Sequence, residues 1–162
     1  MYTRFLLLSF VLAASQAFAY PAIGDKVTWS GTIKNTVGES SEILITKEVI
    51  DFNQSDKQWK IKIHTQIGKD SSEEIINVAE LFTHERYQDI LKNCESQGGV
   101  IEEVTTNPGK YTTCKTRTIT DDGTLVEKWM GDIPFGVVSK STQEQAGVIT
   151  SQSPARNILR DL

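Results

Sequence analysis

The sequence predicts a mainly β protein of the α+β class, an antiparallel sheet of about seven to eight strands with one amphipathic helix packed against it. Between residues 57 and 67, apolar or branched residues alternate with polar ones, which is typical of a strand with one buried face. Turn-forming residues separate this segment from similar ones. One segment alone has the convincing apolar spacing of a surface helix.

The first half of the chain contains four expected strands, at residues 26–34, 41–52, 57–67 and 73–78. Trp29 lies on the apolar side of the first, and Trp59, Ile61 and Ile63 lie on the apolar side of the third. In the second strand, residues 43–45 are all apolar, which indicates a bulge or burial on both faces. Turns rich in Asn, Asp, Gly and Ser follow the second and third strands, so neighbouring strands are expected to pair.

The helix is expected to begin after Thr83, whose hydroxyl can cap it, with acidic Glu85 in the first turn. One side of this helix carries Tyr87, Ile90, Leu91 and Cys94. The other side is wholly polar, and two glycines at residues 98–99 end the helix. The helix is therefore expected to pack across the sheet with one side in water.

Four further strands are expected at residues 100–106, 110–120, 124–132 and 136–141. Trp129 lies in the third of these, and Asp121-Asp122-Gly123 predicts a tight hairpin before it. Residues 142–162 are mostly polar and lack aromatic residues, which predicts a poorly ordered tail with a possible short terminal helix after Ser153. The expected organisation is a signal peptide at 1–19, one β-rich domain at 20–141 and the polar tail at 142–162.

Residues 1–19 have the features of a secretory signal peptide. Arg4 precedes an apolar run, and Ala17-Phe18-Ala19 fits the small-x-small pattern of a cleavage site between Ala19 and Tyr20. A retained membrane anchor is the alternative, but the apolar run is about half of the ~20 residues that a spanning helix needs. The chain is therefore expected to be exported, periplasmic or secreted, with no membrane span after processing.

The chain has two cysteines, Cys94 and Cys114. An exported protein enters an oxidising compartment, so the two are expected to form a structural disulfide. Closing a loop of this size stabilises a fold by about 3 kcal/mol in the chain-entropy description. Two free buried thiols are the alternative; no Cys-x-x-Cys motif or neighbouring histidine indicates a redox or nucleophilic role.

Charge and motifs exclude several function classes. Without residues 1–19, 16 Lys and Arg stand against 21 Asp and Glu, a net charge of −5, which argues against nucleic acid or anionic lipid as the main partner. His64 and His84 have no metal-ligand spacing with each other or with the cysteines. Nucleophile, zinc-protease and phosphate-loop motifs are absent from the sequence. We therefore expect no catalytic residues, no metal and no cofactor.

Three segments of the second half share features with known sequences: Leu81-Phe82-Thr83, Pro108-Gly109-Lys110-Tyr111 leading to Cys114, and Pro134-Phe135-Gly136-Val137-Val138. In these segments the chain resembles a loose group of uncharacterised bacterial exported or periplasmic proteins. The resemblance covers less than half of the chain and carries no activity. It implies a curved antiparallel sheet wrapped part-way around a helix, similar to the half-barrels of the lipoprotein-carrier type.

Two functions from different classes remain open. A binding module would hold a lipid or another apolar ligand on the concave face of the sheet, lined by some of Trp29, Trp59, Ile61, Ile63 and Trp129. A structural or protein-interaction component of the cell envelope would instead use a sheet edge or the tail to contact another protein. These large residues could also simply fill the core.

Overall fold

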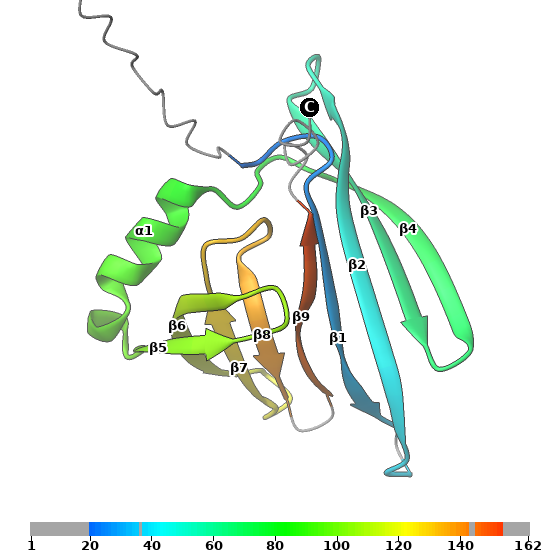
Figure 1. Ribbon diagram of the computed structural model, residues 1–162, viewed down its shortest axis with the longest axis vertical. Coiled ribbons are helices and arrows are strands. Elements are labelled where there is room, and N and C mark those ends of the chain that lie inside the picture. The colour runs from blue at the N-terminus through cyan, green and yellow to red at the C-terminus, as the bar shows by residue number, and fades with distance from the viewer. Residues whose placement is uncertain (1–19, 36, 143–144, 154–162) are drawn as a thin grey trace, which may run out of the picture.

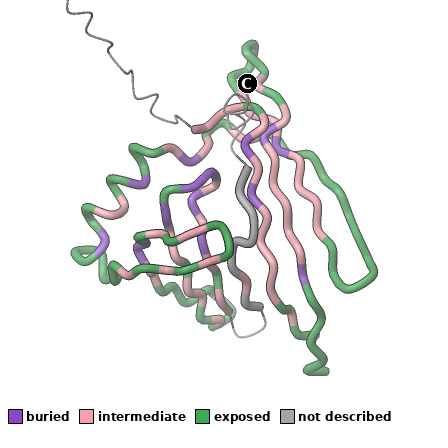
Figure 2. The backbone as a smooth tube through the Cα atoms, in the orientation of Figure 1, coloured by how far each residue is buried: buried purple, intermediate pink, exposed green. Residues whose placement is uncertain are grey.

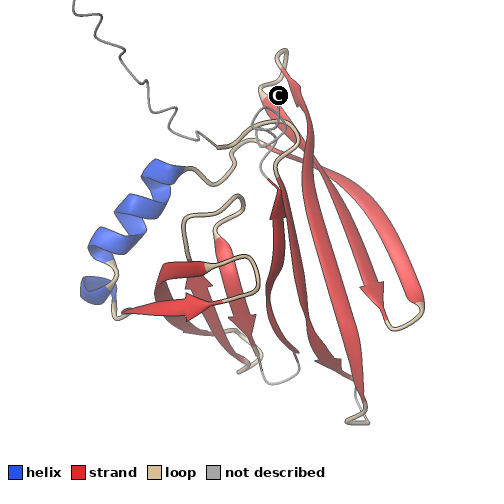
Figure 3. Ribbon diagram, viewed as in Figure 1, coloured by secondary structure: helices blue, strands red, loops and turns tan. Residues whose placement is uncertain are grey.

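The computed structural model describes residues 20–35, 37–142 and 145–153. The expected signal peptide and the expected terminal helix at 154–162 lie outside these residues. The elements are β1 (Lys26–Lys34), β2 (Ser40–Asn53), β3 (Gln58–Ile67), β4 (Asp70–Val78), α1 (His84–Asn93), the short 3₁₀ helix η1 (Glu95–Gln97), β5 (Val100–Thr105), β6 (Lys110–Ile119), β7 (Leu125–Met130), β8 (Val137–Ser141) and β9 (Gln145–Ser153). The mainly β class with one α-helix is confirmed for the described residues (Figure 3).

The strands form one curved antiparallel sheet in the order β4-β3-β2-β1-β9-β8-β7-β6-β5 (Figure 1). All neighbours except β1 and β9 are consecutive in the chain, so the sheet consists of two meanders, β1–β4 and β5–β8, joined by β9. The outermost strands, β4 and β5, are not paired with each other, and the sheet stays open. The irregularity expected in β2 is present, but the register shifts between Val49 and Asp51 rather than at residues 43–45.

β9 corrects the prediction that residues 142–162 are a polar tail. The strand lies between β1 and β8, with Trp29 opposite Ile149 and Lys140 opposite Gly147. β1 pairs with β9 along nearly its whole length, and β8 adds backbone partners on the other side at residues 146–148. This long-range pairing compensates for the polar composition that predicted a tail. The boundary at residue 141 is therefore wrong, and the sheet extends to Ser153.

Thr83 caps α1 as expected: its hydroxyl accepts a hydrogen bond from the Arg86 N–H at 3.2 Å. Figure 1 shows α1 beside the β5–β6 end of the sheet, with β2 to β4 on the other side of the molecule. The Tyr87 hydroxyl donates to the Thr112 carbonyl at 3.1 Å. Cys94 follows the helix, and its sulfur lies 2.05 Å from that of Cys114 on β6, which confirms the predicted pair.

The buried core is small for a sheet of this size. Val27, Ile133 and Val138 are fully buried and pack with Trp29 and Phe135, among others. Figure 2 shows that much of the remaining sheet is half-buried or exposed, and β4 is exposed along nearly its whole length. Among the described residues, no helix is long and apolar enough to cross a membrane. A single short helix thus leaves much of the sheet uncovered.

Candidate functional site

One face of the sheet collects most of the large apolar residues of β1 to β3. Strand register sets Val27 opposite Lys47 and Trp29 opposite Ile45, and it sets Ile61 opposite Val49. Residues directly opposite each other in an antiparallel pair point to the same side. We call this side the Trp29 face; it carries Val27, Trp29, Ile45, Lys47, Val49, Ile61 and Ile63.

The first cavity lies between the Trp29 face and α1. It has a volume of about 330 Å³ and is lined by Ile61 and Ile76 of the sheet and by Ile90 of α1, with Phe82 and Phe135. Lys47, Glu80 and Arg86 supply the charged groups of the lining. The lining is therefore mostly apolar, with charges from β2, from α1 and from the segment between β4 and α1.

The second cavity lies on the Trp29 face beside β8. It has a volume of about 300 Å³ and is lined by Trp29, Ile45, Phe135 and Val137, with three lysines, Lys47, Lys128 and Lys140. Lys47 and Phe135 line both cavities, so the two hollows adjoin. Sites for small ligands have volumes of about 300–1,000 Å³, mostly apolar walls and a few polar groups. The two adjoining cavities together have the volume, the mostly apolar walls and the few polar groups of such a site.

Phe135 stands between the cavities in an unusual backbone conformation. Its φ of 66° is in the left-handed region, which bulky residues rarely adopt. A tight turn holds it: the Gly131 N–H donates to the Gly136 carbonyl, and the Gly136 N–H donates to the Ile133 carbonyl, both at 2.9 Å. The Phe135 ring meets the Trp29 ring edge-on at a centroid distance of 6.2 Å. Strained residues are common at ligand sites, where the surrounding fold holds them in place.

Trp29 is fixed at the wall of the second cavity. Its indole N–H donates to the Val137 carbonyl at 2.6 Å. The bond joins β1 to β8 across the intervening β9. The indole is therefore held in a single position, and its ring remains available as an apolar wall.

Lys47 is the least exposed of the three lysines. Burial lowers the pKa of Lys47, the Lys140 ammonium lowers it further, and Glu74 acts in the opposite direction. Lys128 and Lys140 are exposed. The ion pairs among the described residues use other basic groups: Lys26, Lys60, Lys62, His84, Lys110, Lys115 and Arg117. The second cavity thus holds positive charge that no carboxylate of the described residues pairs at close range.

The structure brings together some of the residues expected to line a ligand site. Trp29 lines the second cavity and Ile61 the first. Ile63 shares their face between Lys47 and Glu74 but lines neither cavity. Trp59 packs against Phe52 with a centroid distance of 4.6 Å, at the β2–β3 hairpin.

Trp129 does not join this site. Lys128 lines the second cavity, and its neighbour on the same strand points to the opposite side because successive strand residues alternate. The Trp129 indole N–H donates to the Glu102 carboxylate, and the Lys115 ammonium lies 4.5 Å from its ring centroid. Trp129 therefore lies apart from Trp29 and lines neither of the two cavities.

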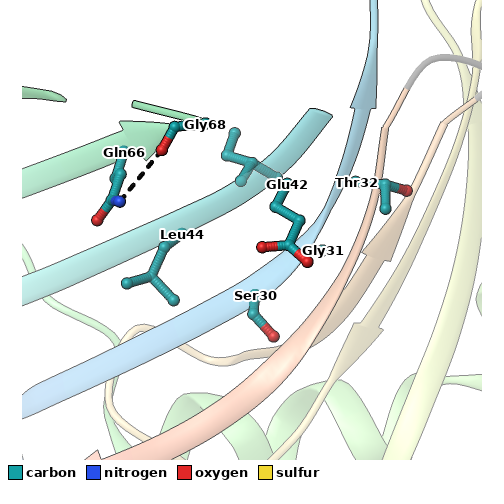
Figure 4. A pocket seen from close by; sticks show the side chains of 8 residues that line it. Ser30, Gly31, Thr32, Glu42, Leu44, Gln66 and Gly68 are labelled. Atoms are coloured by element: carbon teal, nitrogen blue, oxygen red, sulfur yellow. Dashed lines mark hydrogen bonds between the residues drawn. The ribbon is translucent and has the colours of Figure 1, made fainter. Parts of the chain in front are cut away.

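A polar hollow of about 460 Å³ lies over β1, β2 and β3 (Figure 4). It is lined by Ser30, Thr32, Glu42, Leu44 and Gln66, among others. The Gln66 side chain donates to the Gly68 carbonyl at 3.2 Å. These groups alternate with members of the Trp29 face, so the hollow lies mainly on the opposite side of the sheet.

Asp132 joins the start of the described chain to the start of α1. The Tyr20 hydroxyl donates to its carboxylate, and the His84 Nδ1–H donates to it at 2.9 Å. The hydrogen bond and the negative charge of Asp132 raise the pKa of His84. Burial and the same carboxylate raise the pKa of Tyr20. A histidine and a carboxylate alone do not make a catalytic site, because no nucleophile contacts His84 in the described residues.

We expect the Asp132→Asn variant to lower the pKa of His84 toward the usual 6.5, as measured by NMR titration of the imidazole. In the folded protein the pKa is raised, so the protonated pair stabilises the fold below about pH 6.5. This contribution is lost as the pH rises through the folded-state pKa. Tyr20→Phe serves as the control because it leaves the His84–Asp132 pair intact. An identical His84 titration in Asp132→Asn would contradict the pairing.

The residues that complete the site were not expected from sequence. For Lys47 the sequence did contain an indication of its place on the apolar face of the strand. Ile43, Ile45 and Val49 flank it at alternate positions. Phe135 stood out only as part of a turn, and its φ leaves no mark in a single sequence. In the described segments, no group of three His, Cys, Asp or Glu residues could hold a metal ion.

No protein-family model, curated protein or solved structure matches this chain.

Proposed function

We propose that the protein binds an apolar ligand, such as a lipid or an acyl chain, in the adjoining cavities of the Trp29 face. The observation that carries the proposal is the position of Phe135 between two apolar hollows, held there in a left-handed conformation. The small core also supports it, because the side chains do not fill the space between the sheet and α1. The ligand would replace solvent against Trp29, Ile45 and Ile61.

The proposal places the protein outside the cytoplasm. The sequence supports export followed by cleavage between Ala19 and Tyr20. An acyl chain in an aqueous compartment exposes apolar surface that a protein cavity can remove from water. A role without chemical turnover fits the absence of nucleophile and metal-protease motifs in the sequence.

Titration calorimetry with octan-1-ol, decan-1-ol and dodecan-1-ol tests the proposal with neutral ligands. Each added methylene is expected to tighten binding about fourfold until the chain fills the cavities, since burying one methylene contributes about 0.8 kcal/mol. Ile45→Thr should weaken binding of the longest alcohol about tenfold, because it replaces part of the cavity wall with a hydroxyl.

Leu44→Thr is the matched control for Ile45→Thr. The two residues are neighbours on β2, but Leu44 lines the polar hollow, whereas Ile45 lines the second cavity. Leu44→Thr should therefore leave alcohol binding unchanged. Absence of binding for all three alcohols, or equal losses in the two variants, would remove the proposal.

The second candidate function is the binding of a partner protein through the edge of β4. Within the described part of the chain, β4 is paired only with β3, and Ile75 on it is 56% exposed. An unpaired edge can accept an added strand from a partner. Crosslinking with wild type and Ile75→Lys would test this role, and an unchanged set of partners would count against it. A deletion of residues 142–162 is not a suitable test of partner binding, because it would remove β9 from the sheet.

A further inference from the structure

We infer that the ligand carries a negatively charged end group, which lies between Lys47, Lys128 and Lys140 while its apolar chain occupies the space beside Phe135. The inference rests on the proposed function and adds the chemical class of the ligand. A carboxylate and a phosphate monoester share this chemistry. Long-chain alkanoates and alkyl phosphates are thus the ligand classes that fit.

The charge of the second cavity carries the inference. Among the described residues, its lining contains three lysines, from β2, β7 and β8, and no acidic residue. Like charges gathered around a partly desolvated hollow repel one another. An anion bound among them would remove this repulsion and gain charge-assisted hydrogen bonds.

The arrangement of the cavities gives the ligand a direction. Lys128 and Lys140 are exposed, so an end group beside them would remain close to water. Lys47 and Phe135 lie where the second cavity adjoins the first, whose walls include Ile61 and Ile90. A chain that enters at the exposed lysines can therefore pass Phe135 and reach the apolar space beneath α1.

Other charged groups around Lys47 do not supply the missing counter-charge. Glu74 on β4 faces Lys47 and favours its protonated form, but no ion pair within 4.0 Å joins them. Glu80 lines the first cavity together with Arg86, so one carboxylate there offsets one of the two basic side chains, Arg86 and Lys47. The positive excess is larger in the second cavity, whose lining carries three lysines.

The test compares dodecanoate, dodecyl phosphate and dodecan-1-ol by titration calorimetry below their critical micelle concentrations. We expect at least one of the two anions to bind about tenfold more tightly than the alcohol, since hydrogen bonds to a charged group are the stronger ones. The anion that binds more tightly identifies the end group. Acetate and inorganic phosphate, which lack the chain, should bind far more weakly than either.

Lys47→Met and Lys140→Met should each reduce the ratio of anion affinity to alcohol affinity about tenfold. Lys69→Met is the matched control, because it removes the same charge from an exposed turn between β3 and β4. A urea unfolding midpoint no lower than that of wild type would show that Lys47→Met folds, as expected when a partly buried charge is removed.

The outcomes separate the two proposals. Equal affinities for the anions and the alcohol, or an equal effect of Lys69→Met, would overturn the anionic end group and leave the apolar site standing. Failure of all three long-chain compounds to bind would overturn both.

Discussion

Replacing both cysteines by alanine is expected to lower the free energy of unfolding by about 3 kcal/mol, measured by urea denaturation. The Cys94–Cys114 bond closes a loop with a sequence separation of 20 residues. It joins the end of α1 to β6, where the Tyr87–Thr112 hydrogen bond is one of the few other connections. Without it, the unfolded chain gains conformational freedom and the helix loses its covalent attachment to the sheet.

The wild-type protein treated with reductant provides the comparison for this variant. Reduced wild type and the double alanine variant should unfold at similar urea concentrations, below that of the oxidised protein. A double variant as stable as the oxidised protein would contradict the assigned role of the bond. Complete alkylation of both cysteines without reductant would contradict the bond itself.

Gly136→Ala is the second change with a large expected effect, a loss of about 2–4 kcal/mol in the free energy of unfolding. Gly136 has φ of 73°, and a Cβ atom there would approach the Phe82 ring to 2.7 Å. Both the strained backbone and the overpacked ring contribute. The change should also weaken dodecan-1-ol binding, because Phe82 and the adjacent Phe135 line the first cavity.

Gly98→Ala separates the two contributions. Gly98 has φ of 79°, close to that of Gly136, but a Cβ atom there would meet nothing within 4 Å. Its cost is therefore expected to be about 1 kcal/mol, from the backbone alone, with ligand binding unchanged. Equal losses of stability in Gly98→Ala and Gly136→Ala would show that the contact with Phe82 is unimportant.

Local patterns predicted most of the sheet. Trp59 and Ile61 alternate with polar residues, and this alternation predicted β3 because it depends only on residues of the strand itself. Thr83 likewise predicted the start of α1, because its hydroxyl caps the helix that directly follows it. β9 was not predicted because it is stabilised by pairing with β1, which is distant in sequence, and with β8, which is partly polar. Pairing of this kind leaves little trace in a local pattern.

The candidate site was predictable only in part. Trp29 and Ile61 were expected because each alternates with polar residues on its own strand. The side on which Trp129 lies was not predictable because β7 reads Leu-Val-Glu-Lys-Trp-Met, which does not show which side is buried. Phe135 enters the site through a positive φ that the tight turn imposes, and the sequence alone does not reveal such a turn geometry.

The most direct test of the apolar site is an NMR titration of the protein with dodecanoate, following the indole N–H signals of Trp29 and Trp129. Trp29 lines the second cavity, whereas Trp129 lies on the opposite side of the sheet beside Glu102. We predict that the Trp29 signal shifts in proportion to bound ligand and that the Trp129 signal stays in place. A shift of Trp129 alone, or no shift of either signal at saturating ligand, would contradict binding at the Trp29 face.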